Sequence, residues 1–276
     1  MEAPMPPLIR SVVEVDGAEL SYLAAGEADS PPLLLLHGTF WSRVWAPVLP
    51  ALGTAARCIA LDLPGFGASA GELTPEEATV PALAQTVVHA AEALGFESFD
   101  VAGHDIGGGI AQHLAATTGR VRRMVLMNAV MFDSWPVPAV ERFRAPEVRE
   151  STSAADLLEA REASTRGSTL RPLRDDEIAD YLSPWHEPAR VRSWTAMAAS
   201  ADAQYTVALV PALKQAAVPT RLVWGRDDDF QKLDYGRRYV AEIPNSDLVV
   251  VEGKHIPTED SPHEVAQAIV EHLTAA

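Results

Sequence analysis

The chain has 276 residues, of which 47% are hydrophobic and 22% are charged. This size and composition predict one large globular domain with a sizeable core and room for an inserted subdomain. The formal net charge of −16 argues against nucleic acid or an anionic membrane as a partner. No apolar run approaches the ~20 residues of a membrane helix, and the first ten residues lack the pattern of a signal peptide. The sequence therefore favours a cytoplasmic protein, either a monomer or a homodimer.

The first third of the chain alternates apolar runs with turn and helix signals. Residues 12–22 alternate apolar and polar side chains around Asp16-Gly17, which predicts a β-hairpin. The apolar runs 33–36 and 58–61 predict strands that are buried on both faces of a sheet. Helices are expected at about 45–52 and 80–94.

The next stretch has the pattern of a nucleophile elbow. Residues 99–102 predict a short strand, and residues 110–115 predict an amphipathic helix. Between them, Gly103 and Gly107 stand two residues before and two residues after Asp105. Only small residues fit these places in the tight turn, which lifts the central side chain to the top of the sheet, facing the helix N-terminus. Serine is the usual residue at the centre, and Asp105 takes its place here.

The second half of the chain contains a long helical insertion. Apolar runs predict strands at 121–127, 220–225 and 248–251, and a last helix is expected at about 262–273. Between the first two of these strands the pattern predicts helices only, at about 154–163, 175–182 and 189–203. We therefore expect a helical lid at residues 131–211, inserted into a core made of residues 1–130 and 212–276. Strands that alternate with helices predict a mostly parallel sheet in this core.

Five motifs follow predicted strands in a fixed order: His37-Gly38, the run 62–67 (Asp-Leu-Pro-Gly-Phe-Gly), the elbow around Asp105, the run 225–228 (Gly-Arg-Asp-Asp), and the run 253–255 (Gly-Lys-His). In this order they resemble the α/β-hydrolase fold family over nearly the whole chain. The resemblance implies an α/β fold with a mostly parallel eight-stranded sheet, flanked by helices and carrying an inserted lid.

The same resemblance implies a catalytic triad, which in this family runs nucleophile, acid, histidine along the chain. Matched residue by residue, the nucleophile is Asp105, the acid is Asp228 and the base is His255. The backbone N–H groups of Thr39 and Ile106 match the oxyanion hole. The implied chemistry uses no cofactor and no metal.

An aspartate nucleophile changes the reaction that the site can perform. A carboxylate with a reference pKa of ~3.9 is ionised at pH 7 and needs no base for its attack. On a saturated carbon bearing a leaving group, it would form an alkyl ester on the enzyme. His255, oriented by Asp228, would then activate a water against that ester. The sequence therefore predicts a two-step hydrolase that acts on a small hydrophobic organic substrate.

Two substrate classes suit this chemistry, and the resemblance covers both. An epoxide leaves as an alkoxide and requires a proton donor, for which the lid offers Tyr205 and Tyr181. A haloalkane leaves as halide, which in the family is held by a tryptophan after the nucleophile, where this chain has Ile106. We therefore expect an epoxide hydrolase first and a haloalkane dehalogenase second.

Other readings stay open at this point. They are another cofactor-free reaction, such as ester or lactone hydrolysis or a rearrangement, and a non-catalytic descendant that only binds a ligand. Aromatic and polar side chains beside the motifs or in the lid are further candidates for substrate contact: Phe40, Trp41, Trp135, Trp185 and His186.

Overall fold

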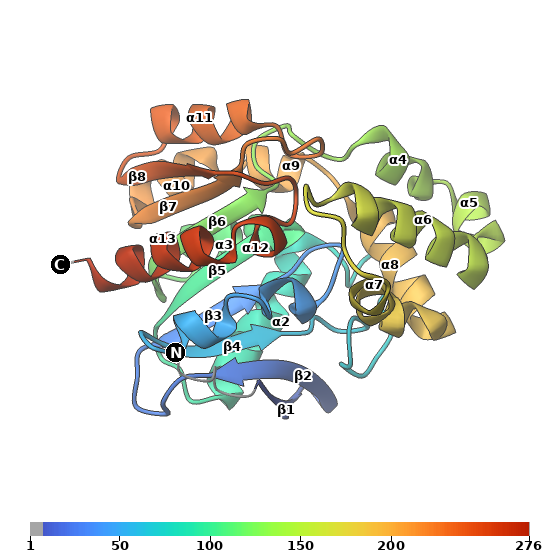
Figure 1. The fold of residues 1–276 in the computed structure, drawn as a ribbon, viewed down its shortest axis with the longest axis horizontal. Helices are drawn as coiled ribbons and strands as arrows, with labels where there is room; N and C mark the ends of the chain where they lie inside the picture. Colours follow the sequence, from blue (N-terminus) through green and yellow to red (C-terminus); the bar gives the residue numbers. More distant parts are fainter. Residues whose placement is uncertain (1–7, 276) are drawn as a thin grey trace.

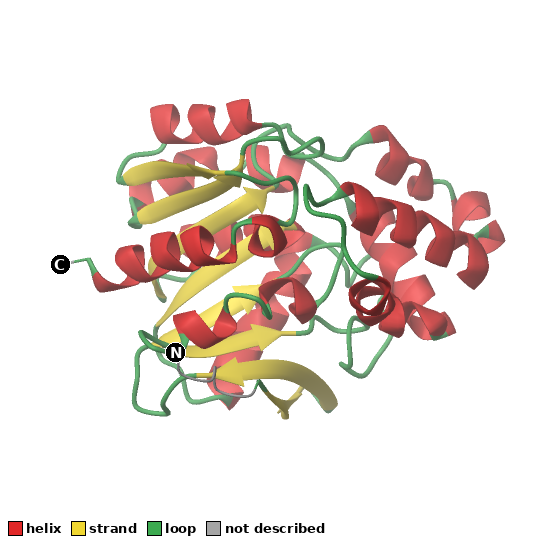
Figure 2. Ribbon diagram, viewed as in Figure 1, coloured by secondary structure: helices red, strands yellow, loops and turns green. Residues whose placement is uncertain are grey.

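The structure is a computed structural model, and it describes residues 8–275. Eight strands form one sheet in the order β1-β2-β4-β3-β5-β6-β7-β8, visible as a single twisted layer in Figure 2. Their bounds are β1 Ile9–Val15, β2 Ala18–Ala25, β3 Pro32–Leu36, β4 Arg57–Leu61, β5 Phe99–Asp105, β6 Val121–Ala129, β7 Thr220–Gly225 and β8 Ser246–Val251. The predicted eight-stranded sheet is confirmed.

The strand directions place one antiparallel hairpin at the edge of a parallel sheet. β1 pairs with β2, and β2 pairs with β4, in antiparallel register. All pairs from β4 to β8 are parallel. The predicted turn between β1 and β2 forms at Asp16 and Gly17, which both have positive φ angles. The carboxyl ends of the six parallel strands consequently meet at one edge of the sheet.

Two apolar cores lie on the two faces of the sheet. Because successive strand residues point to opposite faces, Leu34 and Leu36 join one core while Leu33 and Leu35 join the other. All four side chains are fully buried. This two-sided burial explains why the parallel strands appear in the sequence as continuous apolar runs.

Helices cover both faces, as Figure 1 shows. Those of the core are α1 Leu49–Leu52, α2 Val80–Ala93, α3 Ile106–Thr117, α11 Leu233–Glu242, α12 Pro257–Asp260 and α13 Pro262–Thr274, with the 3₁₀ helix η1 Ser42–Trp45. Side chains of α2, α3 and α11 belong to one core, and those of α1 and α13 to the other. The helix expected at 45–52 is divided into η1 and α1, and α11 was not predicted. Among residues 8–275, no helix combines the length and apolar character that a membrane crossing requires.

All of the regular secondary structure between β6 and β7 is helical. It contains α4 Pro138–Glu141, η2 Arg142–Arg144, α5 Pro146–Ser151, α6 Ala154–Gly167, α7 Asp175–Leu182, η3 Ser183–His186, α8 Pro188–Ser200, α9 Gln204–Val207 and α10 Val210–Ala216. Helices α4 to α8 stand together beyond the carboxyl ends of the strands, at the right in Figure 1, and we call them the cap. Helices α9 and α10 instead pack against α3 of the core.

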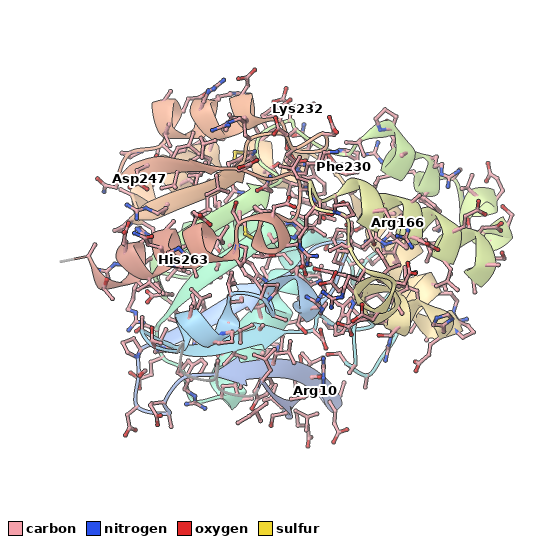
Figure 3. The ribbon with its side chains drawn as sticks, viewed as in Figure 1. Arg10, Arg166, Phe230, Lys232, Asp247 and His263 are labelled. Carbon is pink, nitrogen blue, oxygen red and sulfur yellow. The ribbon has the colours of Figure 1, made fainter. Side chains whose placement is uncertain are left out.

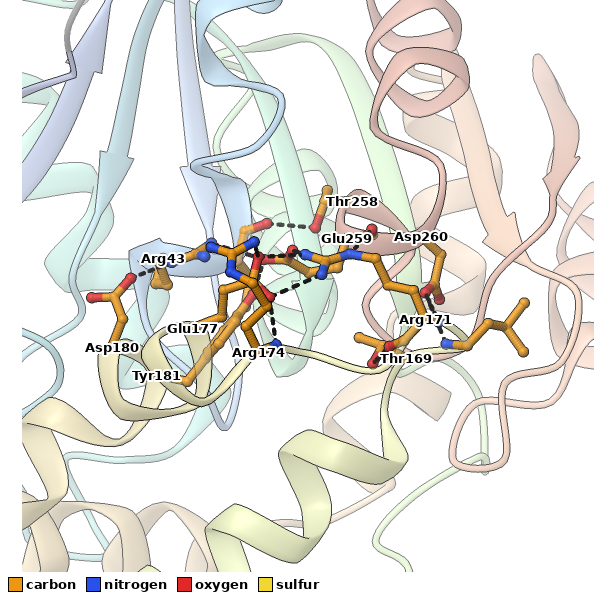
Figure 4. Close-up of polar contacts among 12 residues, drawn as sticks. Arg43, Thr169, Arg171, Arg174, Glu177, Asp180, Tyr181, Thr258, Glu259 and Asp260 are labelled. Atoms are coloured by element: carbon orange, nitrogen blue, oxygen red, sulfur yellow. Dashed lines mark hydrogen bonds and ion pairs between the residues drawn. The ribbon is translucent and has the colours of Figure 1, made fainter.

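A buried carboxylate, Glu259 of α12, fastens the cap to the core (Figure 4). Its Oε1 accepts hydrogen bonds from Arg43 Nη1 at 2.8 Å and from the Tyr181 hydroxyl at 2.9 Å. Its Oε2 pairs with Arg171, which also holds Glu177 of α7 through both of its terminal nitrogens. Core segments and cap segments therefore share one charge network.

Replacing Glu259 with glutamine is expected to destabilise the protein by about 2–3 kcal/mol. Breaking a buried ion pair costs ~3–5 kcal/mol, and the partial exposure of Arg171 reduces that cost. For a chain of this size the loss corresponds to a fall in Tm of roughly 5 °C or more, measurable by calorimetry. The control is Glu162→Gln, which removes a half-exposed surface ion pair with Arg166. An unchanged Tm for Glu259→Gln would show that the network does not hold the cap.

Candidate active site

The residues singled out by the sequence motifs gather at the carboxyl edge of the sheet. Thr39 follows β3, Asp105 ends β5, Asp228 follows β7 and His255 follows β8. The strand order reverses between β3 and β5, and in open parallel sheets a crevice forms at such a point. Four segments far apart in the sequence are thus brought to one place by the sheet topology.

The elbow has the tight geometry that its small residues indicate. Asp105 has φ 54° and ψ −125°, a backbone conformation that few residues other than glycine adopt. A Cβ on Gly103 would lie 2.3 Å from the carbonyl oxygen of Gly107. A Cβ on Gly107 would lie 2.4 Å from the carbonyl oxygen of Leu36. Glycine at both places lets β5, α3 and β3 approach closely enough to present Asp105 above the sheet.

One oxygen of the Asp105 carboxylate is already held by Thr39. The backbone N–H of Thr39 donates to Asp105 Oδ2 at 3.0 Å, and the Thr39 hydroxyl donates to the same oxygen at 2.9 Å. A Cβ on Gly38 would lie within 2.6 Å of both Asp105 Oδ2 and the Ile106 nitrogen, so only glycine fits there. The predicted oxyanion-hole positions, Thr39 and Ile106, therefore both lie beside Asp105.

His255 and Asp228 form a hydrogen-bonded pair. Nδ1 of His255 lies 3.0 Å from Asp228 Oδ2, and both side chains are almost fully buried. Burial lowers the pKa of His255, but the charge of Asp228, its hydrogen bond and the charge of Asp105 together raise the pKa above its ordinary value. Burial raises the pKa of Asp228, whereas His255 and further hydrogen bonds lower it to below its ordinary value. The pair is thus arranged to keep Asp228 ionised and His255 basic.

Asn128 at the end of β6 supports this pair. Its Nδ2 donates to Asp228 Oδ2 at 2.6 Å, and its Oδ1 accepts the Gly225 N–H at 3.0 Å. The Phe230 N–H donates to the other oxygen, Asp228 Oδ1, at 2.7 Å. An amide at 128 cannot serve as the acid itself, and here it orients the acid and favours its charged form.

His104, one residue before the nucleophile, positions the backbone of the base. It is fully buried, and burial together with the charge of His255 lowers its pKa to about 4. Its neutral ring places Nε2 2.8 Å from the carbonyl oxygen of His255, to which an Nε2–H tautomer donates. His104 is therefore a positioning residue.

A cavity of about 770 Å³ opens between the triad and the cap. Asp105, Thr39, Ile106 and His255 line its floor. The cap and the adjoining loops supply mainly apolar walls: Phe40, Val130, Trp135, Pro136, Val137, Val140, Phe143, Val148, Leu157, Trp194 and Phe230. Phe230, labelled in Figure 3, stands at the junction of core and cap. The nucleophile and the base thus face a cavity whose walls are mainly apolar.

Two of the predicted contact residues, Phe40 and Trp135, line this cavity, and the others lie elsewhere. Tyr181 is fully buried and gives its hydroxyl hydrogen to Glu259, while Tyr205 packs against the core. The expectation that either tyrosine faces the substrate is therefore corrected.

The three remaining candidates also lie outside the lining. The Trp41 indole donates to the backbone of Tyr181, Trp185 packs edge-on against Phe66, and His186 is exposed. Their positions depend on how the cap is turned relative to the core, and the sequence pattern does not specify that orientation.

Among the cavity residues that the sequence analysis did not anticipate is Arg161 of α6. Leu157, Ala160, Arg161 and Ser164 line the cavity from one face of that helix. Their spacing of three and four residues is the signal that places them together. What the spacing does not reveal is that this face points at Asp105.

Curated relatives of the chain include enzymes of two kinds. A haloalkane dehalogenase of Bradyrhizobium diazoefficiens is 27% identical over 92% of this chain and 90% of its own length. Haloalkane dehalogenase 2 of Mycobacterium bovis is 29% identical, covering 90% and 89%. Epoxide hydrolase 4 of Mus musculus is 25% identical, covering 91% and 75%.

Solved structures and a family model agree on the fold. The haloalkane dehalogenase DbeA from Bradyrhizobium elkani superposes with a TM-score of 0.83 at 23% identity, covering 97% of this chain and 98% of that one. An alpha/beta hydrolase fold protein from Burkholderia ambifaria has a TM-score of 0.84 at 24% identity, covering 97% and 98%. The model of the alpha/beta hydrolase family matches residues 33–268. Because that match spans most of the chain, the protein belongs to the alpha/beta hydrolase family.

Proposed function

We propose that the protein hydrolyses a bond between a saturated carbon and a leaving group through an ester on Asp105. The observation that carries this proposal is the elbow carboxylate, whose Oδ2 accepts two hydrogen bonds from Thr39 in the cavity that His255 also lines. A serine at this position would require His255 for its activation. A carboxylate does not, so His255 is left for the second step.

In the first step Asp105 Oδ1 attacks the carbon, a C–O bond forms, and the leaving group departs with the electrons of the broken bond. In the second step His255 takes a proton from water, and the resulting hydroxide adds to the ester carbonyl. The negative charge then develops on Oδ2, where the Thr39 N–H already donates, and one such donor is worth ~3 kcal/mol. The alkyl oxygen leaves and takes the proton from His255, which releases the alcohol and leaves Asp105 as the carboxylic acid. This acid loses its proton to solvent, and the carboxylate is restored.

A carbon–halogen bond suits the cavity better than an epoxide. None of the described residues that line it is a tyrosine, so the phenol that alkoxide departure was expected to use is missing from the walls. A halide leaves without a proton. Relatives named haloalkane dehalogenases, 27% and 29% identical, also support a halide rather than an epoxide as the first candidate substrate. Epoxide opening is the second candidate, supported by the relative named epoxide hydrolase 4.

A His255→Gln variant is expected to accumulate the ester, because attack by Asp105 needs no base and hydrolysis does. The variant is incubated with 1-bromobutane, with 2-bromobutanoate or with 1,2-epoxybutane, and its intact mass is then measured. An adduct with the mass of an alkyl or a carboxyalkyl group supports a halide substrate, and one with a hydroxyalkyl group supports an epoxide. Peptide mapping should locate it on Asp105.

The control is His263→Gln, which changes an exposed histidine of α13 (Figure 3) and should behave as the wild type. If the wild type turns over any of these compounds while His255→Gln neither slows nor carries an adduct, the proposed ester mechanism is wrong.

A further inference from the structure

An unpaired cation lies in the cavity wall opposite the triad floor. Arg161 of α6 lines the cavity and is only 4% exposed. Its Nε and Nη2 atoms are buried and find no hydrogen-bond partner among the residues that the structure describes. A buried guanidinium without a partner is costly, because water no longer solvates its charge. Such a buried charge therefore calls for an anionic partner.

The surroundings of Arg161 hold its charge without neutralising it. The guanidinium carbon lies 4.3 Å from the centre of the Phe40 ring, 5.6 Å from that of Trp194 and 5.7 Å from that of Trp185. Aromatic faces attract a cation but accept no strong hydrogen bonds. Burial lowers the pKa of Arg161 to about 10, although the charge of the Asp105 carboxylate acts to raise that pKa. The guanidinium is therefore still charged at pH 7.

The unpaired charge of Arg161 indicates which kind of partner is missing. Nε and Nη2 are enclosed by protein atoms, so a ligand in the cavity meets the guanidinium at its remaining nitrogen, Nη1. A charge-assisted hydrogen bond from this nitrogen suits an anionic oxygen such as that of a carboxylate. The other walls of the cavity are mainly apolar and suit an alkyl chain. A halide formed in the first step would leave the charge unpaired while substrate binds, whereas a carboxylate on the substrate would pair with it from the start.

We propose that Arg161 binds a carboxylate on the substrate, so that the substrate class is a 2-haloalkanoate or a closely similar acid. This rests on the proposed function for the reaction, but the anion site itself does not depend on the ester chemistry. Arg161 also offsets the repulsion between the substrate carboxylate and Asp105 during the attack. With a 2-haloalkanoate the products are the 2-hydroxy acid, halide and a proton.

The site is tested first by binding, with unreactive probes. Calorimetry measures the affinity of butanoate and of its neutral analogue butanamide for the wild type, Arg161→Met, Arg161→Lys and Arg166→Met. We expect Arg161→Met to lose about 10- to 100-fold in butanoate affinity, as charged hydrogen bonds predict, with butanamide unaffected. The butanoate affinity of Arg161→Lys should lie between those of the wild type and Arg161→Met, because lysine keeps the charge but loses the planar guanidinium. Arg166→Met, an exposed change on the same helix (Figure 3), should match the wild type.

Turnover provides the second test. The ratio of kcat/KM for 2-bromobutanoate to that for 2-bromobutanamide should fall about 10- to 100-fold in Arg161→Met. Misfolding is checked by Tm, which should equal or exceed that of the wild type, because the change removes an unpaired buried charge.

Equal losses on the acid and the amide, or butanoate affinity that does not depend on Arg161, would overturn the proposal. If butanoate binds through Arg161 but none of the halogenated or epoxide compounds reacts, the anion site stands and the proposed function fails.

Discussion

Replacing Asp105 with asparagine is expected to lower kcat by on the order of 10⁵-fold or more, the effect seen when a hydrolase loses its nucleophile. The amide has nearly the same shape as the carboxylate, but it carries no charge and forms no stable ester. Asparagine also tolerates the positive φ of 54° at this position, so the elbow should keep its geometry. The measurement is steady-state turnover of the best substrate from the panel.

The control for this variant is ligand binding. Asp105→Asn should bind butanoate at least as tightly as the wild type, because a negative charge has been removed from the cavity. A second readout uses water labelled with oxygen-18, which should enter the Asp105 side chain of the wild type over repeated turnovers. Activity within tenfold of the wild type, or an unlabelled side chain, would assign the attack to another group.

Replacing Asp228 with asparagine is expected to slow ester hydrolysis by about 10⁴-fold, because His255 would lose the partner that fixes its tautomer and stabilises its charge. Ester formation should survive, since it does not use the base. Rapid-quench measurement should therefore find one equivalent of halide released quickly, followed by slow turnover.

Asp227→Asn is the matched control, because Asp227 is the adjacent, exposed acid. It should leave both phases unchanged. Equal slowing of both phases in Asp228→Asn would place Asp228 in the first step, against the scheme.

The same pair sets the pH dependence of the second step. A protonated His255 cannot take a proton from water, so kcat should fall as the pH drops below the pKa of His255. Because that pKa is raised, the midpoint of this fall in kcat, the acid limb of the pH profile, should lie above the ordinary histidine pKa of ~6.5. In Asp228→Asn the opposing influence of burial remains, so the limb should move to lower pH.

Much of the core could be predicted from the sequence, because each of its signals is local. Four consecutive leucines between proline and glycine signals favour a strand buried on both sides, and glycines two residues either side of Asp105 favour a tight turn. The motif residues Thr39, Asp228 and His255 follow strands, and parallel strands bring their carboxyl ends together. Helix α11 was missed because it is short and buries only Gly236 and Tyr239, so its apolar residues form no long buried face.

The cavity walls could not be predicted in the same way. Helical spacing shows which cap residues share a face, but the direction of that face depends on contacts between cap and core such as those of Glu259. The tertiary structure thus turned Tyr181, an expected proton donor, towards Glu259, and it brought Arg161, for which the sequence suggested no role, into the cavity that Asp105 lines. The sequence by itself determined the sheet and the order of the reacting groups, since these depend on local burial and chain direction. Only the tertiary structure decided which charged side chains line the cavity, because that depends on how the cap packs on the core.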